Sequence, residues 1–262
     1  MQGRVSDPPL LFPTMNTVID LPRIVAHRGA KANAPENTIA AFRRAHEEGA
    51  RWVEFDVKLT ADGQPVIIHD HTLERTTSGR GEVRGKTLAE LQALDAGAWF
   101  GQAFAGERIP SLAEGLDFLA SQRMGFNLEV KPCAGRERDT AEVALKLVRQ
   151  RWPAELPTPI ISSFKLESLE AAREVAPELP RGYLVDKLTP DWRATAERLG
   201  CAAIHPGMRH LTHDQAREIK AAGYALLTWT VNDVGRGRDL LAWGADSLIT
   251  DAPGDIAAGL AL

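Results

Sequence analysis

Cysteine is scarce in this chain of 262 residues. It has only Cys133 and Cys201, which lie far apart and do not form a CxxC pair. A disulfide framework therefore does not hold the fold together, and a reducing compartment is expected. We expect both thiols to be free and buried.

Long apolar runs are missing as well. No window reaches the roughly 18 apolar residues that a membrane-spanning helix needs, and the first twenty residues lack the apolar segment of a secretory signal peptide. We therefore expect a cytoplasmic protein without a membrane anchor, in which residues 1–21 form an irregular tail.

The chain has no large excess of positive or negative charge. The chain has 31 Lys and Arg against 35 Asp and Glu, a net charge of −4 at pH 7. A mildly acidic chain without a basic stripe interleaved with aromatics is not expected to bind nucleic acid. No GxGxxG sequence follows the first expected strand, which disfavours a dinucleotide-binding sheet.

What the sequence does contain is a repeated alternation of strand-like and helix-like segments. Expected helices include 38–49, which Thr38 can cap and Gly49 can end, and 140–152. Eight or nine βα units in about 240 residues predict a (β/α)8 TIM barrel over residues 22–262. An open, doubly wound sheet is the alternative. The expected strands are 23–27, 52–59, 65–70, 125–131, 159–164, 181–186, 202–206, 225–231 and 246–251.

One stretch interrupts this alternation. Residues 72–110 are rich in glycine and too long for an ordinary βα loop. We interpret them as a small insertion after the early strands, with one short helix near 88–94. Its aromatics Trp99, Phe100 and Phe104 are expected to pack the insertion onto the barrel or, alternatively, to line a substrate entrance.

Polar side chains recur where the expected strands end. In a barrel of parallel strands, these ends meet at one rim, and active sites form there. Residues two apart on one strand also point to the same side. The residues concerned are His27, Arg28, Glu54, Asp56, His69, Asp70, Glu129, Lys131, Ser163, His205, Trp229 and Asn232.

The three acids in this set are unusual for a barrel interior. Glu54, Asp56 and Glu129 occupy positions where valine or isoleucine is normal, and unpaired buried carboxylates cost several kcal/mol each. Three hard oxygen ligands suit Mg²⁺ or Ca²⁺ better than zinc. The alternative is a set of internal salt bridges to Arg28 and Lys131.

Two histidines and two cations complete the set. Imidazoles such as His27 and His69 can act as general acid and general base near neutral pH. Arg28 and Lys131 beside an oxygen-ligated metal suit an anionic, oxygen-rich substrate, most simply a phosphate ester. The residues thus predict metal-assisted phosphoester cleavage but do not identify the ester.

Several motifs then resemble a known family. From about Leu21 to Pro253, the chain resembles the glycerophosphodiester phosphodiesterases, most closely the cytosolic bacterial enzymes. The motifs are "AHRG", "PENT", "EFDVKLTADGQPVIIHD", "LERTTSGRG", "LDAGAWF", "LEVKP", "TWTVN" and "GADSLITDAP".

The resemblance implies a TIM barrel with a small insertion and one divalent cation. It also implies hydrolysis of glycerophosphodiesters, such as glycerophosphocholine and glycerophosphoethanolamine, to sn-glycerol 3-phosphate and an alcohol. Trp229 matches an aromatic that borders the glycerol site. The remaining roles are an acid/base pair at His27 and His69, metal ligands at Glu54, Asp56 and Glu129, and phosphate contacts at Arg28 and Lys131.

Two other functions remain open at this point. A lysophospholipase D-type enzyme of the same fold would need an apolar groove for an acyl chain. A non-catalytic barrel that holds a phosphorylated metabolite would keep the two cations and gain nothing from the histidines. In each case the partner is a small molecule, and a homodimer is possible.

Overall fold

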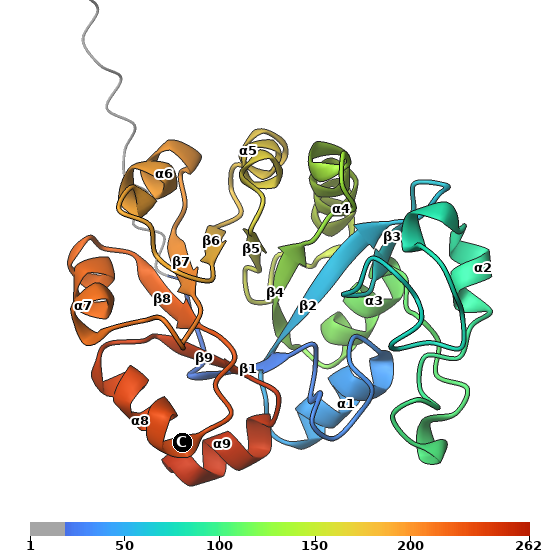
Figure 1. Ribbon diagram of the computed structural model, residues 1–262, viewed down its shortest axis with the longest axis horizontal. Coiled ribbons are helices and arrows are strands. Elements are labelled where there is room, and N and C mark those ends of the chain that lie inside the picture. The colour runs from blue at the N-terminus through green and yellow to red at the C-terminus, as the bar shows by residue number, and fades with distance from the viewer. Residues whose placement is uncertain (1–18) are drawn as a thin grey trace, which may run out of the picture.

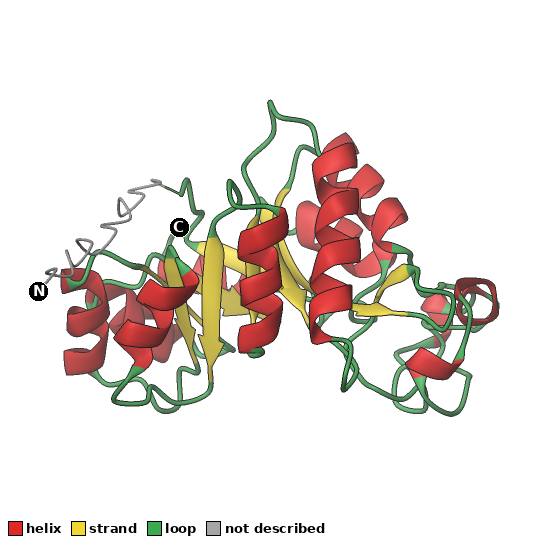
Figure 2. Ribbon diagram, turned by 90° about the horizontal axis from the view of Figure 1, so that it is seen from above, coloured by secondary structure: helices red, strands yellow, loops and turns green. Residues whose placement is uncertain are grey.

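The computed structural model describes residues 19–262, so the expected tail lies outside the described residues except for its last three positions. Eight parallel strands close into a barrel in the order β1-β2-β4-β5-β6-β7-β8-β9, with β9 paired to β1. Figures 1 and 2 show helices packed around this inner ring. The predicted TIM barrel is confirmed, and the open sheet is wrong.

The elements follow the expected alternation closely. The strands are β1 Ile24–His27, β2 Trp52–Leu59, β3 Pro65–Ile67, β4 Gly125–Val130, β5 Ile160–Ser163, β6 Arg181–Val185, β7 Ala203–Pro206, β8 Ala225–Thr228 and β9 Ser247–Thr250. The helices are α1 Ile39–Glu47, α2 Leu88–Gln92, α3 Leu112–Ser121, α4 Glu137–Arg151, α5 Leu166–Val175, α6 Trp192–Leu199, α7 His213–Ala221, α8 Val234–Ala242 and α9 Pro253–Leu260.

Strand β3 differs from the expectation. It runs antiparallel to β2, with Val57 opposite Ile67, and it lies outside the closed ring. The turn Ala61-Asp62-Gly63 is too short for a parallel crossover, so the chain doubles back as a hairpin. His69 therefore reaches the barrel rim from the end of this hairpin and not from a strand of the barrel.

The inward-facing side chains change character along the barrel axis. Near the amino ends of the strands they are apolar and pack together as the barrel floor, with Ile19 and Leu21 against them. Two residues later on the same strands, the inward positions are polar, for example His27 above Val25 and Asp251 above Ile249. The polar end is the carboxyl end, where a TIM barrel carries its active site. The floor residues are Val25, Trp52, Ile160, Ala203, Leu227 and Ile249.

Gly125 makes room for the largest of these floor side chains. A Cβ atom at this position would lie 2.3–2.8 Å from atoms of the Trp52 ring. Trp52 and Gly125 are register partners on β2 and β4, so the missing side chain lets the indole lie across the inside of the barrel.

Local signals account for the helix boundaries. The Thr38 hydroxyl accepts a hydrogen bond from the Ala41 N–H at the start of α1, and Gly49 follows its end with φ +86°, as predicted. Helices α3 and α9 were not predicted. The signal for α3 was a capping box, in which Ser111 and Glu114 satisfy each other's backbone N–H groups.

The segment between β3 and α3 has a small core of its own. It contains two short 3-10 helices, Val83–Gly85 and Gln102–Phe104, and helix α2 within the predicted 88–94. The division of the chain into tail, barrel and insertion stays a prediction. The buried residues of this core are Val66, Ile68, Leu73, Val83, Leu91, Ala96 and Ile109.

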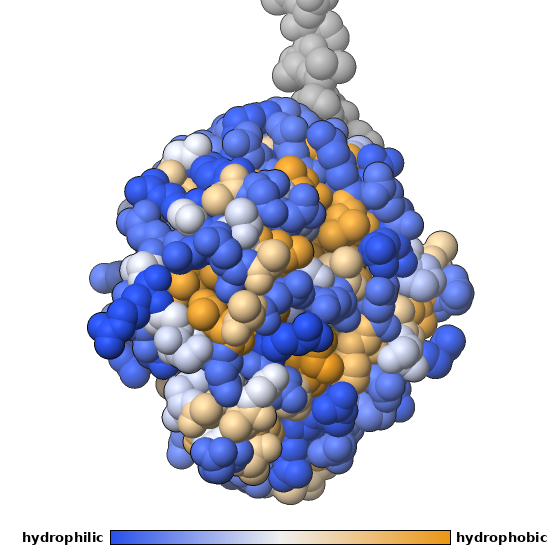
Figure 3. Space-filling view, turned by 90° about the vertical axis from the view of Figure 1, so that its right-hand side faces the viewer, coloured by the Kyte–Doolittle hydropathy of each residue, from blue (hydrophilic) through white to orange (hydrophobic). Residues whose placement is uncertain are grey.

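The aromatics of this segment contact one another edge to face. The ring centres of Trp99 and Phe100 are 5.7 Å apart, and those of Phe100 and Phe104 are 5.5 Å apart. Figure 3, viewed from the side where α2 lies in Figure 1, shows a mostly hydrophilic surface with apolar residues in small separate patches.

Two predictions, that the cysteines are free and buried and that no helix spans a membrane, can be compared with the described residues. Both cysteines are free, but only Cys133 is buried, while Cys201 is half-buried. Within residues 19–262, no helix combines the length and the apolar character needed to cross a membrane.

Candidate active site

A cavity of about 240 Å³ opens at the carboxyl end of the barrel strands. Seven of the eight predicted site residues line it, and the eighth, Asp56, lies fully buried beside it. The lining residues are His27, Arg28, Glu54, His69, Asn127, Glu129, Lys131, Phe164, Leu184, Trp229 and Ile249. The structure thus brings the predicted residues together, although the role of each stays a prediction.

The turn after β1 aims the first of these residues. Arg28 has a positive φ of 56°, and its backbone N–H donates to Glu54 Oε2 at 3.1 Å. Gly29 follows with φ +82°, and a Cβ atom there would lie 2.6 Å from the Ala41 backbone in α1. A residue without a side chain is therefore required where this turn passes the helix.

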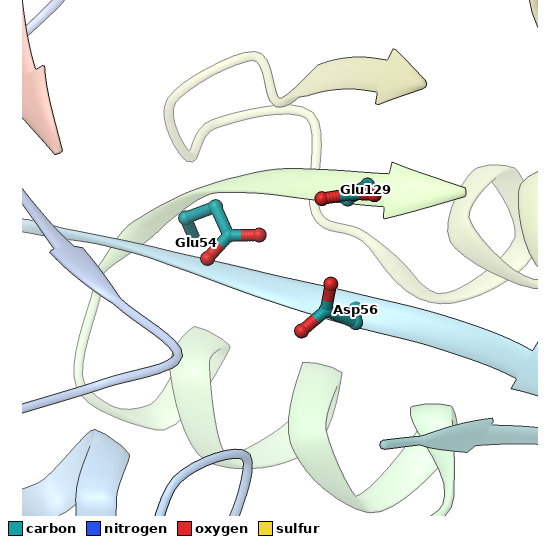
Figure 4. A group of neighbouring side chains, drawn as sticks. All are labelled: Glu54, Asp56 and Glu129. Atoms are coloured by element: carbon teal, nitrogen blue, oxygen red, sulfur yellow. The ribbon is translucent and has the colours of Figure 1, made fainter. Parts of the chain in front are cut away.

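The three acids point toward a common space. Glu54 and Asp56 project from β2 and Glu129 from the neighbouring β4 (Figure 4), and one carboxylate oxygen from each lies within 4.8 Å of the others. Asp56 is held from below by the Asn37 side chain, whose amide donates to Asp56 Oδ2 at 2.9 Å. No more than a few per cent of each acid is exposed to solvent.

Salt bridges to the two cations are present, as the alternative predicted, but they leave carboxylate charge uncompensated. Lys131 Nζ lies 3.3 Å from Asp56 Oδ1 and 3.0 Å from Glu129 Oε1, and Arg28 Nε lies 3.3 Å from Asp56 Oδ2. Arg28 also pairs with a fourth acid, Glu36, at 2.8 Å. Lys131 and Arg28 are thus each shared between two carboxylates. Among the described residues, the Glu54 carboxylate has no side-chain ammonium or guanidinium group within 4 Å.

The pKa values reflect this imbalance. Burial and the neighbouring carboxylates raise the pKa of Glu54 well above its ordinary value, and burial and Asp56 raise that of Glu129 to about 7. Burial also works to raise the pKa of Asp56, but Arg28 and Lys131 outweigh it and hold that pKa well below its usual range.

These residues fit a divalent cation. Three converging carboxylates supply hard oxygen ligands of the type that Mg²⁺ and Ca²⁺ prefer. A doubly charged ion would offset the repulsion that raises the pKa of Glu54. The acidic triad is therefore better explained as a cation site than as internal salt bridges alone.

Asp251 fixes the orientation of the first histidine. His27 Nδ1 lies 2.6 Å from Asp251 Oδ1. An ionised carboxylate only accepts hydrogen bonds, so Nδ1 carries the proton and Nε2 is left as the free basic nitrogen. Nε2 lies on the side of Glu54, at 3.9 Å from Oε2. Asn232 in turn donates to the other Asp251 oxygen at 2.8 Å.

The second histidine is held by a longer network. His69 Nδ1 lies 2.6 Å from Asp70 Oδ1, and the Arg75 guanidinium donates to both Asp70 oxygens at 2.6 and 3.0 Å. Arg75 also donates to both Glu36 oxygens, at 2.8 and 2.7 Å. Because Glu36 pairs with Arg28 as well, one chain of contacts joins the second histidine to Arg28.

Burial favours the neutral form of both imidazoles. Burial lowers the pKa of His27, even though the hydrogen bond with Asp251 works in the opposite direction. Burial and nearby cations also lower the pKa of His69, to about 4. A neutral imidazole is the form that can accept a proton.

An aromatic pair forms another wall of the cavity. Trp229 and Phe164 meet edge to face, with ring centres 5.5 Å apart, and Trp229 Nε1 donates to the His205 carbonyl oxygen at 2.9 Å. Lys131 Nζ lies 5.8 Å from the centre of the Phe164 ring. This wall adjoins the cationic side of the cavity.

The residues that the sequence did not single out as parts of the site include Asp251, Phe164 and Arg75. Asp251 and Phe164 are each the last residue of an expected strand, which is the signal that selected the others. Arg75 had no such signal, because it lies in the irregular segment after β3.

Comparison with known proteins now decides the family. The sequence model of the glycerophosphoryl diester phosphodiesterase family matches residues 27–255, most of the chain. The chain belongs to this family. It is also 39% identical, over 88% of its own length and 94% of the relative's, to a glycerophosphodiester phosphodiesterase of Caldanaerobacter subterraneus subsp. tengcongensis.

Solved structures agree. A phosphodiesterase of Oleispira antarctica, in complex with the product sn-glycerol 3-phosphate, superposes with a TM-score of 0.90 at 41% identity, covering 92% of this chain and 98% of the other. A glycerophosphodiester phosphodiesterase of Agrobacterium tumefaciens str. C58 gives a TM-score of 0.74 at 31% identity, covering 91% of this chain and 100% of the other.

Membership of this family confirms that the chain is an enzyme, a phosphoric diester hydrolase on a TIM barrel. The predicted non-catalytic barrel is therefore not supported. The predicted resemblance and enzyme class are correct. The cation and the roles of individual residues remain predictions.

Proposed function

We propose that this enzyme hydrolyses glycerophosphodiesters such as glycerophosphocholine and glycerophosphoethanolamine to sn-glycerol 3-phosphate and an alcohol. The observation that carries the proposal is the meeting of two histidines, three acids and two cations around one cavity of about 240 Å³. Glu54, Asp56 and Glu129 would hold one Mg²⁺ or Ca²⁺ ion. When bound, such an ion would withdraw charge from the phosphate and orient the glycerol end of the substrate.

Arg28 and Lys131 bind the phosphate in this proposal. Both line the cavity, and both pair with Asp56, so their positive charges lie beside the acidic triad. Their positive charges would stabilise the extra negative charge that develops on the phosphoryl oxygens in the transition state. Trp229, on the aromatic wall, would border the glycerol group.

The histidines move the protons. We assign His69 as the base, which takes a proton from the nucleophile, and His27 as the acid, which protonates the leaving alkoxide. The bound phosphodiester and Asp251 are both negative, and they favour the protonated form of His27 that this role requires. One P–O bond forms to the nucleophile while the P–O bond to the alcohol breaks.

Two nucleophiles fit this scheme. The glycerol 2-hydroxyl would give a cyclic phosphate that water then opens, with the histidines exchanging roles in the second step. Direct attack by water would give the products in one step. A search for the cyclic phosphate by ³¹P NMR during turnover separates the two routes.

Turnover of glycerophosphocholine with Mg²⁺ or Ca²⁺, with and without a chelator, tests the proposal. We expect the chelator to abolish activity and added cation to restore it. We also expect His27→Ala and His69→Ala each to lower kcat by about 10²–10⁴-fold. His213→Ala is the matched control, since this exposed histidine packs against Trp243 outside the cavity. Normal turnover by both His27 and His69 variants would refute the assignment.

A lysophospholipase D-type activity has less support in this structure. The aromatics Trp99, Phe100 and Phe104, which would have supplied an acyl groove, do not line the cavity. Comparing turnover of glycerophosphocholine with that of lysophosphatidylcholine measures the preference directly. Cytoplasmic localisation and a possible homodimer stay predictions.

A further inference from the structure

Asn127 is a cavity residue to which the proposed mechanism gives no role. Its side chain is 1% exposed and lines the cavity, yet neither its amide oxygen nor its amide nitrogen has a hydrogen-bond partner within the described protein. Burying an unpaired amide costs free energy, and nearly all buried polar groups in folded proteins are paired. This amide is therefore placed to bind something that enters the cavity.

Its position on the strand shows where in the cavity that partner would lie. Asn127 is the register partner of Glu54 and comes two residues before Glu129 on β4, so it lies on the same face, one level nearer the barrel floor. Leu184 and Ile249, which also line the cavity, are apolar. Asn127 thus places an uncharged polar group beside Glu54 and one level below Glu129.

The chemistry of an amide narrows the choice of partner. A primary amide offers two N–H donors and one carbonyl acceptor and carries no charge. It is therefore poorly suited to bind a phosphate, for which Arg28 and Lys131 are better placed. An alcohol hydroxyl can donate one hydrogen bond and accept up to two, so it is complementary to the amide.

We propose that Asn127 is a specificity-determining residue that binds a hydroxyl of the substrate's glycerol group. This inference rests on the proposed function, because it takes the glycerol end of the diester as the part that enters the cavity. A ligand with the hydroxyl satisfies the amide, whereas a ligand without it leaves the amide buried and unpaired. Sites of this kind discriminate strongly against the analogue that lacks the hydroxyl.

Product binding measures this discrimination without requiring turnover. Inhibition constants are compared, at fixed Mg²⁺, for sn-glycerol 3-phosphate and propyl phosphate, which have the same three-carbon skeleton with and without hydroxyls. Asn127→Leu replaces the amide by an apolar group of similar volume. We expect this variant to bind sn-glycerol 3-phosphate about tenfold more weakly, or weaker still, and to bind propyl phosphate as well as the wild type or slightly more tightly.

Ser162→Ala is the matched control. Ser162 lies on the adjacent strand β5, is fully buried, and its hydroxyl also lacks a hydrogen-bond partner within the described protein, but it does not line the cavity. We expect this variant to keep the wild-type preference between the two ligands. Thermal melts establish that each variant is folded, and Asn127→Ala serves if the leucine variant is not.

The results separate failure of this inference from failure of the proposed function. A folded Asn127 variant that keeps the wild-type preference overturns the inference, as expected if the amide binds only water. An equal loss of affinity for both ligands also overturns it, because that pattern indicates general damage to the site. If the wild-type enzyme does not turn over glycerophosphodiesters, the proposed function fails, and calorimetric binding of the same two ligands still tests Asn127.

Discussion

At the scale of single residues, the site depends on groups that act through the proposed catalytic ones. Asp251 determines which nitrogen of His27 is protonated, and Glu36 is shared between Arg28 and Arg75. Neither residue lines the cavity, so each is a positioning residue. Replacing Asp251 should therefore change the catalytic rate, and replacing Glu36 should change how stability depends on pH.

Asp251→Asn should lower kcat by about 10²–10³-fold. An asparagine side chain can present its NH₂ group to His27 Nδ1, which favours the wrong tautomer and removes the charge that stabilises the imidazolium. Asp246→Asn is the control, because Asp246 immediately precedes β9, at the opposite end of that strand, and pairs with Lys220. Steady-state kinetics with glycerophosphocholine would contradict the prediction if both variants were equally active.

Glu36 should make stability depend on acid pH. Burial works to raise its pKa, but Arg75 and Arg28 outweigh burial and lower it from 4.5 to about 2. A depressed folded-state pKa stabilises the protein fully above the unfolded value, and this contribution is lost as pH falls from about 4.5 toward 2. Glu36→Gln should flatten that part of a profile of melting temperature against pH. The exposed helix residue Glu47, changed to Gln, should leave the profile as it is.

At the scale of elements, the predicted insertion, residues 72–110, contributes to the site through the side chain of Arg75. Arg75 is close to half-exposed and does not line the cavity, yet it joins Asp70 and Glu36 through four hydrogen bonds. This segment is therefore expected to order the histidine at the end of the β3 hairpin. Its own buried core, between Val66 and Ile109, gives it a stable place from which to do so.

Arg75→Lys should lower kcat/KM about tenfold. An ammonium group cannot make the two paired contacts that the planar guanidinium makes, so His69 and Arg28 lose their common support. Arg84→Lys, in the same segment, pairs with Glu82 at the surface and should have no effect on kinetics. Wild-type rates for Arg75→Lys would show that the network does not position the site.

At the scale of the whole molecule, the barrel divides into an apolar floor and a polar rim. Inward-facing and outward-facing positions alternate along each strand, and both are buried, the inward ones in the floor or rim and the outward ones against the helices. The outward faces pack against the helices in two clusters, one around Phe42, Phe55 and Phe126 and one around Trp192 and Leu226. We expect this close packing to hold the side chains of the site in fixed positions.

Gly125→Ala should destabilise the protein by about 1–3 kcal/mol, because the new methyl group would overlap the Trp52 ring inside a closely packed barrel. Urea unfolding followed by circular dichroism measures the change. Gly85→Ala is the control, because a Cβ atom there meets no atom within 4 Å. Equal stability of the two variants would show that the floor tolerates the added volume.

The sequence by itself determined the alternation of strands and helices, and it placed Glu54 with Asp56 and Glu129 with Lys131 on one face of each strand. Local period and residue type are sufficient for this, because side chains two apart on one strand face the same side wherever that strand lies. The predicted residues His27, Arg28 and Trp229 also lie at the cavity, because the carboxyl ends of parallel strands share one rim. His69 reaches the same cavity from the antiparallel hairpin instead.

Only the tertiary structure decided the contacts that closure of the barrel creates. Asp251 reaches His27 across 224 positions because β9 pairs with β1, and the antiparallel direction of β3 follows from a turn that local pattern did not resolve. Arg75 contacts Glu36, which precedes β2 in the sequence, and Asp70, which follows it. Asn127 looks like any other polar residue of a strand in the sequence, and only the fold shows that it lines the cavity. Such contacts depend on which distant strands pair and in which register. The repeat of apolar residues within one segment carries no information about either.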